Sequence, residues 1–135
     1  MSDYLLDANV VLDIATTDRI WAEWSEGQLL AAVEKRGRVI INPLIYAEIS
    51  QAFASASELD LWVRPSVFHR VALPYEAAWL AGQAFVKYRR AGGVRTSPLP
   101  DFYIGAHAEV EGLTLVTRDA GRYRTYFPGI RLVCP

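Results

Sequence analysis

The chain has 135 residues, of which 52% are hydrophobic and 21% charged, and its formal net charge is −1. This length and composition favour a single globular domain over residues 1–135 with a substantial apolar core. The near-neutral charge argues against a general nucleic-acid-binding protein. The only cysteine, Cys134, excludes an intrachain disulfide and a cysteine-based zinc site.

The location of the protein is predicted from what its sequence lacks. No apolar run approaches the roughly 18 residues of a membrane span, and the N-terminus is acidic where a secretory signal is basic. We therefore expect a cytoplasmic protein with no membrane partner. Charge is uneven, with ten acidic and five basic residues in 1–67 but five acidic and nine basic residues in 68–135. The basic half fits either a phosphate-attracting rim or an ordinary solvated surface.

The first third of the chain predicts a strand and two helices. Tyr4–Leu6 is a short apolar run that ends at Asp7, and a turn and helix are expected to follow it. Apolar residues at helical spacing predict a helix over Ile20–Glu34, with a break at Gly27 and an end at Gly37.

The middle of the chain repeats the alternation of strand and helix. Val39–Ile41 is a β-branched run, which is typical of a buried strand. Asn42 followed by Pro43 predicts a helix start. This helix is expected to run towards Leu59, and its apolar side to hold Leu44, Ile45, Ala52, Phe53 and Ala56.

The second half of the chain predicts three more strands and three more helices. A strand over Val67–Leu73 precedes a long helix from Pro74 to about Arg90, whose inward-facing residues are expected to be Trp79, Gly82, Phe85 and Val86. After a proline-rich loop, the remaining elements are a helix over Asp101–Glu111, strands at Leu113–Val116 and Ile130–Val133, and a short helix between them. Strands alternate with helices throughout, so we expect an α/β fold with a mostly parallel sheet.

Four acidic residues are placed by this pattern at one edge of the sheet. Asp7 ends the first strand, Asp119 follows the strand at Leu113–Val116, and Glu48 and Asp101 lie near the starts of two helices. Sites in open parallel sheets form outside the carboxyl ends of the strands. We therefore expect the four carboxylates to converge there.

A group of carboxylates needs a counter-charge, because like charges a few ångströms apart repel one another. Carboxylate oxygens suit Mg²⁺ or Mn²⁺, and a divalent ion also supports phosphodiester hydrolysis. Each acid also has an ordinary structural interpretation. Asp7 and Asp119 could be helix N-caps, Asp101 could favour a helix dipole, and Glu48 could be a solvated helix residue. Likewise Asn9 could be a turn residue, and Thr117 could end a strand.

Four segments of the chain together resemble a known family. LLDANVVLDI, NPLIYAEI, LPDFYIGAHAEVEGLTLVTRD and the closing YFPGIRLV are similar to PIN-domain nucleases, and more closely to the VapC-type toxins of bacterial toxin–antitoxin pairs. The similarity covers nearly the whole chain, and the motifs keep their order. It implies a three-layer α/β/α sandwich with a mostly parallel sheet and an endoribonuclease activity that depends on Mg²⁺ or Mn²⁺.

The resemblance also implies roles for individual residues. Asp7, Glu48, Asp101 and Asp119 match the family's acidic positions, with Asp7, Asp101 and Asp119 as the expected metal ligands. Asn9 and Thr117 match supporting polar positions, and Asp13 is interpreted as structural. The family typically forms homodimers and is silenced by a cognate antitoxin. The basic residues expected to hold the RNA backbone are Arg89, Arg90, Arg95 and Arg118.

Two other functions fit parts of the sequence. A phosphomonoesterase with an aspartate nucleophile is suggested by Asp7-Ala8-Asn9, but such enzymes generally have a second Asp at the position of Asn9. A non-catalytic α/β protein-binding module, with the acids as caps and surface charge, is the alternative to a nuclease. An endoribonuclease toxin remains the leading hypothesis because one site accounts for all four acids.

Overall fold

A single parallel sheet organises the chain in the computed structural model, which describes residues 3–135. Its strands lie in the order β3-β2-β1-β4-β5, and every neighbouring pair is parallel. Leu5 in the central strand is in register with Ile40 on one side and Leu115 on the other. The strands are β1 (Tyr4–Leu6), β2 (Val39–Ile41), β3 (Phe68–Arg70), β4 (Thr114–Val116) and β5 (Leu132–Val133). The α/β fold predicted from the sequence is confirmed.

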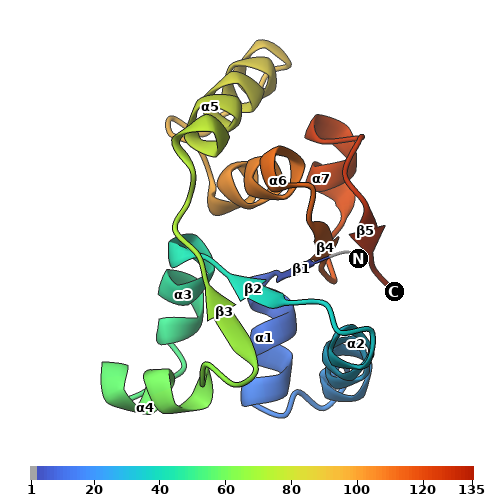
Figure 1. The fold of residues 1–135 in the computed structure, drawn as a ribbon. Helices are drawn as coiled ribbons and strands as arrows, with labels where there is room; N and C mark the ends of the chain where they lie inside the picture. The colour runs from blue at the N-terminus through green and yellow to red at the C-terminus, as the bar shows by residue number, and fades with distance from the viewer. Residues whose placement is uncertain (1–2) are drawn as a thin grey trace.

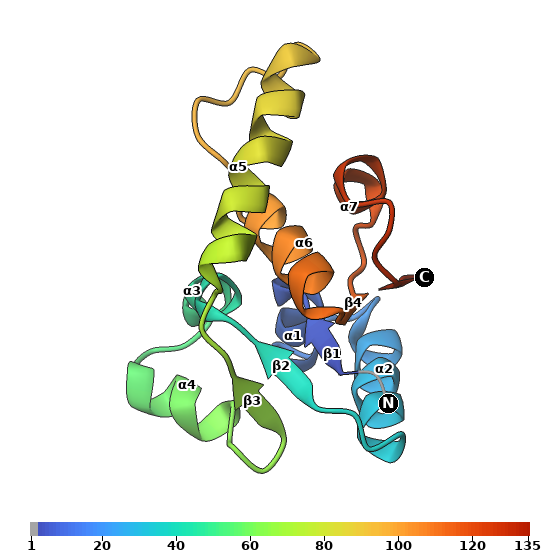
Figure 2. The same cartoon turned by 45° about the horizontal axis from the view of Figure 1, so that its top comes forward.

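Helices cover both faces of the sheet, which gives three layers (Figures 1 and 2). The helices before β3 lie on one face, and those after β3 lie on the other. Each parallel strand pair requires a crossover, and right-handed crossovers place helices on opposite faces once the strand order reverses. The helices are α1 (Ala8–Ala15), α2 (Ala22–Glu34), α3 (Pro43–Ser50), α4 (Ala56–Trp62), α5 (Tyr75–Arg90), α6 (Pro100–Glu111) and α7 (Gly121–Tyr126).

The strand order reverses between β1 and β4, and this position determines where a site can form. The chain moves outward from β1 to β2 and β3, then returns to the other side of β1 with β4 and β5. At such a reversal the connections leave the two central strands in opposite directions, so a crevice opens at their carboxyl ends. Asp7 follows β1 directly, and Thr117 follows β4 directly. The topology therefore brings residues from the two ends of the chain together.

The core consists of the strands and of the helix faces that cover them. Leu5, Leu6, Ile40 and Leu115 are fully or almost fully buried in the sheet. Asn42 caps α3 as the sequence predicts, because its side chain accepts a hydrogen bond from the Ile45 amide and Pro43 occupies the first helical position.

Two helix boundaries differ from those predicted. The helix expected to run from Pro43 towards Leu59 ends at Ser50, and α4 starts separately after Ser55, whose hydroxyl accepts a hydrogen bond from the Glu58 amide. Because the helix is interrupted, Ala52 and Ala56 are exposed instead of lying on an apolar side. The predicted break at Gly27 is also wrong: α2 continues through it without interruption.

The inward face predicted for α5 is partly wrong. Phe85 packs against the core, but Trp79 is 71% exposed and Val86 is 39% exposed. The residues of α5 that are fully or nearly buried are alanines, at positions 77, 81 and 84. These small side chains allow α5 to pack closely on α6, so the larger residues of α5 lie at the edge of the contact or face outward.

No helix within residues 3–135 combines the length and the apolar character that crossing a membrane requires.

Candidate active site

Asp7 lies at the centre of a hydrogen-bond network between β1, β4 and α7. Its Oδ1 accepts a hydrogen bond from the Ala8 amide at 2.8 Å, so it caps α1, as one structural interpretation expects. Its Oδ2 accepts hydrogen bonds from the Thr117 hydroxyl at 2.8 Å and the Tyr123 hydroxyl at 2.9 Å. The helix cap uses only Oδ1, so the hydrogen bonds from Thr117 and Tyr123 to Oδ2 are not part of it. Three donors from three segments therefore fix the Asp7 carboxylate.

Thr117 and Asn9 hold the turn after β4 against the start of α1. The Thr117 oxygen accepts hydrogen bonds from the Asn9 side-chain amide at 3.3 Å and from the Asp119 backbone N–H at 3.1 Å. Asn9 Oδ1 also accepts a hydrogen bond from the Arg118 backbone N–H at 3.1 Å. Both residues therefore fix the backbone that carries Asp119.

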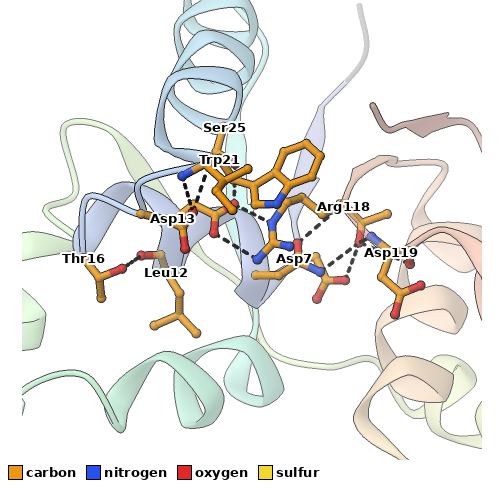
Figure 3. Close-up of polar contacts among 12 residues, drawn as sticks. Asp7, Leu12, Asp13, Thr16, Trp21, Ser25, Arg118 and Asp119 are labelled. Atoms are coloured by element: carbon orange, nitrogen blue, oxygen red, sulfur yellow. Dashed lines mark hydrogen bonds and ion pairs between the residues drawn. The ribbon is translucent and has the colours of Figure 1, made fainter.

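The other three acids lie near Asp7 on different elements. Glu48 comes from α3 and is partly buried, Asp101 lies in the first turn of α6, and Asp119 is exposed just before α7. Asp119 is not a helix cap, because α7 is preceded by Ala120 at that position. Figure 3 shows the Asp119 side chain pointing away from the Arg118 guanidinium.

Burial and mutual repulsion change the acidity of this group of carboxyls. Burial raises the pKa of Asp7, and the charge of Asp119 adds to that increase. Burial together with the charges of Asp7 and Asp101 raises the pKa of Glu48 to about 7. Burial and the charges of Asp7 and Asp119 also raise the pKa of Asp101, although Arg122 opposes them. The four acids are therefore close enough for their charges to interact.

The group does not form a closed metal cage. Within the described part of the chain, no three acidic, histidine or cysteine side chains are placed so that they could hold one metal ion together. Glu48 nevertheless has a solvent-shielded Oε1 without any hydrogen-bond partner in residues 3–135. An unpartnered carboxylate oxygen beside other carboxylates is costly, and a cation is the counter-charge that would relieve it. This donor set suits a hard divalent ion.

The arginines predicted to hold RNA are placed differently from one another. Arg118 forms an ion pair with Asp13, 2.7 Å between Nε and Oδ2. Arg89 donates a hydrogen bond to the Arg95 carbonyl, while Arg90, the last residue of α5, and Arg95, in the loop after it, are exposed. That end of α5 projects away from the sheet (Figures 1 and 2). None of these four arginines forms an ion pair with the four acids in residues 3–135.

Two residues of the site were not assigned to it from the sequence. Tyr123 is buried and donates its hydroxyl hydrogen to Asp7, and its pKa is raised by burial and by the neighbouring acids. Arg122 lies 3.7 Å from Asp101, between Nη1 and Oδ2. Both lie on α7, three and four residues after Asp119. The signals that pointed there were the short predicted helix and, for Arg122, the excess of basic residues in 68–135.

Comparisons with known proteins agree with this architecture. The structure is similar to that of VapBC2 from Rickettsia felis bound to a promoter DNA fragment, with a TM-score of 0.74 and 19% identity over 98% of each chain. It is also similar to DNA-bound VapBC from Salmonella typhimurium, with a TM-score of 0.68 and 24% identity over 99% of this chain and 98% of that one. FitAcB from Neisseria gonorrhoeae follows with a TM-score of 0.67 and 18% identity, over 96% and 95% of the two chains.

At these identities the similar structures establish a shared fold. Among curated protein sequences, none is significantly similar to this chain. The family model described as "PIN domain" matches residues 4–128, a range that includes all four acids, Asn9 and Thr117. The family expected from the sequence motifs is thereby confirmed, and the chain belongs to the PIN domain family.

Proposed function

We propose that the protein is an endoribonuclease that depends on Mg²⁺ or Mn²⁺ and acts as the toxin of a toxin–antitoxin pair. The observation that carries the proposal is the meeting of Asp7, Glu48, Asp101 and Asp119, from four separate elements, around the carboxyl ends of β1 and β4. Membership of the PIN domain family and the fold shared with VapBC proteins support it.

Asp7, Asp101 and Asp119 would hold the metal, with Glu48 beside them. A bound divalent ion supplies charge stabilisation for a phosphate and lowers the pKa of a water molecule. Asp7 is the fixed member of the set, because Ala8, Thr117 and Tyr123 all donate to it. Asp101 and Asp119 are more exposed and would turn towards Asp7 when an ion binds. Because only Asp7 is fixed in place, the four carboxylates interact electrostatically but do not enclose a metal position.

Glu48 would hold and release a proton at its shielded Oε1. Its pKa of about 7 leaves it partly protonated near neutral pH when the site carries no ion. A bound cation would favour the ionised form. Thr117 and Asn9 would keep Asp119 in place by their hydrogen bonds across the two central strands.

The partners in this proposal are RNA, a cognate antitoxin and a second copy of the chain. The carboxylate site with a divalent ion suits phosphodiester hydrolysis, and RNA is proposed as the phosphodiester from the family resemblance. The antitoxin follows from the fold shared with proteins solved as VapBC complexes. A homodimer is proposed from the family resemblance, and Tyr75 and Trp79 on α5 are exposed aromatic residues available for such a contact.

The test is cleavage of total cellular RNA by the purified protein with Mg²⁺, with Mn²⁺ and with EDTA. We expect discrete products that require the metal and are lost in Asp101→Asn. Asp60→Asn is the matched control, because Asp60 is an exposed acid paired with Arg70 outside the site. RNA that stays intact with both metals, or equal cleavage by Asp101→Asn, would contradict the proposal and favour a non-catalytic binding module.

A further inference from the structure

A polar groove lies beside the acidic residues, between α5, α6 and α7. Its volume is about 490 Å³, within the range of small-molecule sites. Asp101 and Asp119 form part of its wall, so the groove is continuous with the candidate active site. The remaining lining residues differ chemically from those acids: they are Tyr88, Arg122, Thr125 and Tyr126. We call this the Arg122 groove.

Arg122 is a cation with unused hydrogen-bonding capacity. Its guanidinium lies 3.7 Å from Asp101, too far for a hydrogen bond, and no hydrogen bond to it is found in residues 3–135. The guanidinium carbon lies 5.6 Å from the Tyr88 ring centroid and 5.5 Å from that of Phe102. The rings position the guanidinium without occupying its N–H donors. Arg122 therefore presents a positioned fork of donors, the arrangement that binds phosphate.

Arg118 differs from Arg122 because its guanidinium is already bound to a carboxylate. Arg118 uses Nε and Nη2 to bind Asp13 at 2.7 and 3.0 Å. Its side chain points towards α1, on the other side of the turn from Asp119 (Figure 3). Of these two arginines flanking Asp119, only Arg122 lines the groove.

An aromatic wall faces the same groove. The Tyr126 ring packs edge-on against Phe102 at 5.4 Å and against Tyr88 at 6.4 Å between centroids. Tyr88 is held in turn by stacking on Phe85 at 5.8 Å. These contacts fix the rings, while Tyr126 stays partly exposed and its hydroxyl has no hydrogen-bond partner in the described chain. A fixed, partly exposed ring with a free hydroxyl is suited to contact a nucleobase.

We propose that the Arg122 groove binds one unpaired nucleotide next to the phosphodiester that is cut. Arg122 binds a phosphate of that nucleotide, and Tyr126 contacts its base. Bases within a duplex are stacked and paired, so only a single-stranded segment or a loop can place a base against this wall. The identity of the ligand as RNA rests on the proposed function. Arg122 and Tyr126 are then the residues that hold this nucleotide beside the cut.

The test measures affinity separately from cleavage. An Asp7→Asn background removes activity while leaving the groove residues in place. A labelled single-stranded hexanucleotide RNA and the same sequence in a duplex are titrated by fluorescence anisotropy with Mg²⁺ at several salt concentrations. The variants are Arg122→Gln and Tyr126→Leu. The matched control is Arg124→Gln, two residues along α7, whose guanidinium lies 3.1 Å from Cys134 Sγ and does not line the groove.

Arg122→Gln is expected to weaken single-strand binding about tenfold and to reduce the slope of log affinity against log salt by about 0.7, the contribution of one phosphate contact. Tyr126→Leu is expected to weaken it about tenfold with no change in that slope. Arg124→Gln is expected to bind as the background does. Thermal melting of each variant establishes that it is folded.

Two results would overturn the groove assignment. One is that folded Arg122→Gln binds single-stranded RNA with the same affinity and salt slope as Arg124→Gln. The other is that the duplex binds as tightly as the single strand. Cleavage by the protein with Asp7 intact is measured in parallel. If that protein cuts RNA while Arg122→Gln binds normally, the nuclease proposal stands and the groove assignment fails. If it cuts no RNA with either metal, the proposed function itself fails.

Discussion

Arg118 and Asp13 form a bidentate ion pair that connects three parts of the molecule. Asp13 is only 3% exposed, and its Oδ2 also accepts a hydrogen bond from the Ser25 hydroxyl at 2.7 Å. The pair therefore joins α1 and α2 to the turn that carries Asp119 (Figure 3). The Trp21 ring lies 5.3 Å from the Arg118 guanidinium. In the free protein Arg118 is a structural cation, which suits the structural role expected for Asp13.

Replacing Arg118 with Met is expected to lower the free energy of unfolding by about 3 kcal/mol, because Asp13 would be left buried without its partner. Urea denaturation measures this. Arg38→Met is the matched control. Its pair with Asp3 leaves the Arg38 side chain 55% exposed, so its loss should cost under about 1 kcal/mol. Equal losses in the two variants would contradict the role assigned to Arg118.

Glu48→Gln is expected to melt at a higher temperature than the unmodified protein at pH 8 in EDTA. Burial raises the pKa of Glu48 from 4.5 to about 7. Between these values the folded chain keeps a proton that the unfolded chain has lost, so stability falls as pH rises. Above pH 7 the folded protein bears the full cost of burying the ionised Glu48 carboxylate. Glutamine carries no charge, so the variant does not bear this cost.

The pH dependence distinguishes this effect from a general gain in stability. At pH 4 Glu48 is mostly protonated in both states, so most of the difference in melting temperature should disappear. Glu34→Gln, at the exposed end of α2, is the control and should change little at either pH. A gain for Glu48→Gln that persists unchanged at pH 4 would show that charge burial is not its cause.

Mn²⁺ or Mg²⁺ is expected to raise the melting temperature by mass action, with a gain of about 2.7 kcal/mol when the metal concentration is 100 times its Kd. Asp101→Asn and Asp119→Asn should each lose most of this response. Asp60→Asn should keep it, because Asp60 lies at the exposed Arg70 pair. Differential scanning fluorimetry with an EDTA reversal measures the shift. A response retained by both site variants would place the metal elsewhere.

Gly105→Ala is expected to destabilise the protein by about 1–3 kcal/mol, because an added Cβ would overlap the buried ring of Phe127. Gly105 lies on α6, which carries Asp101, and Phe127 ends α7, so this contact sets how closely the two helices approach. Phe127→Leu in the same chain should restore part of the loss.

Gly82→Ala is the control for the Gly105 experiment. Gly82 lies within α5 and an added Cβ there meets no other atom within 4 Å, so alanine should stabilise the helix by up to about 1 kcal/mol. Chemical denaturation of Gly105→Ala, of Gly105→Ala with Phe127→Leu and of Gly82→Ala measures whether each change lowers or raises the free energy of unfolding. A Gly105→Ala protein as stable as Gly82→Ala would mean that α6 and α7 are free to separate.

The sequence predicted the class of fold because its local signals agreed with the tertiary structure. Val39–Ile41 is β-branched and became a fully buried strand, and Asn42 with Pro43 began a helix as expected. The prediction from sequence was wrong where two local signals favoured different helix boundaries. Apolar spacing suggested one helix past Ser50, but Ser55 and Glu58, a recognised helix start, mark a second one. The glycine at position 27 was tolerated inside α2 because helix interiors lose only about 1 kcal/mol to it.

The candidate site was predictable in outline but not in its contacts. Strand order alone brings Asp7 to the turn that carries Thr117 and Asp119, so these positions follow from the alternation of strands and helices. The choice of partner for each arginine does not follow, because it depends on side-chain reach in three dimensions. Arg118 was expected at the RNA and is bound to Asp13, whereas Arg122 lies beside Asp101.

The hydrogen bond between Thr117 and Asp7 spans 110 positions of the chain, so the site can form only after β4 has joined the sheet. During synthesis the N-terminal half emerges first with Asp7 and Glu48 but without their partners. A truncated or stalled chain would therefore carry half of a site and none of its chemistry. For a protein proposed to destroy RNA, this order of assembly delays activity until the segment that carries Thr117 and Asp119 has been made and has folded against β1.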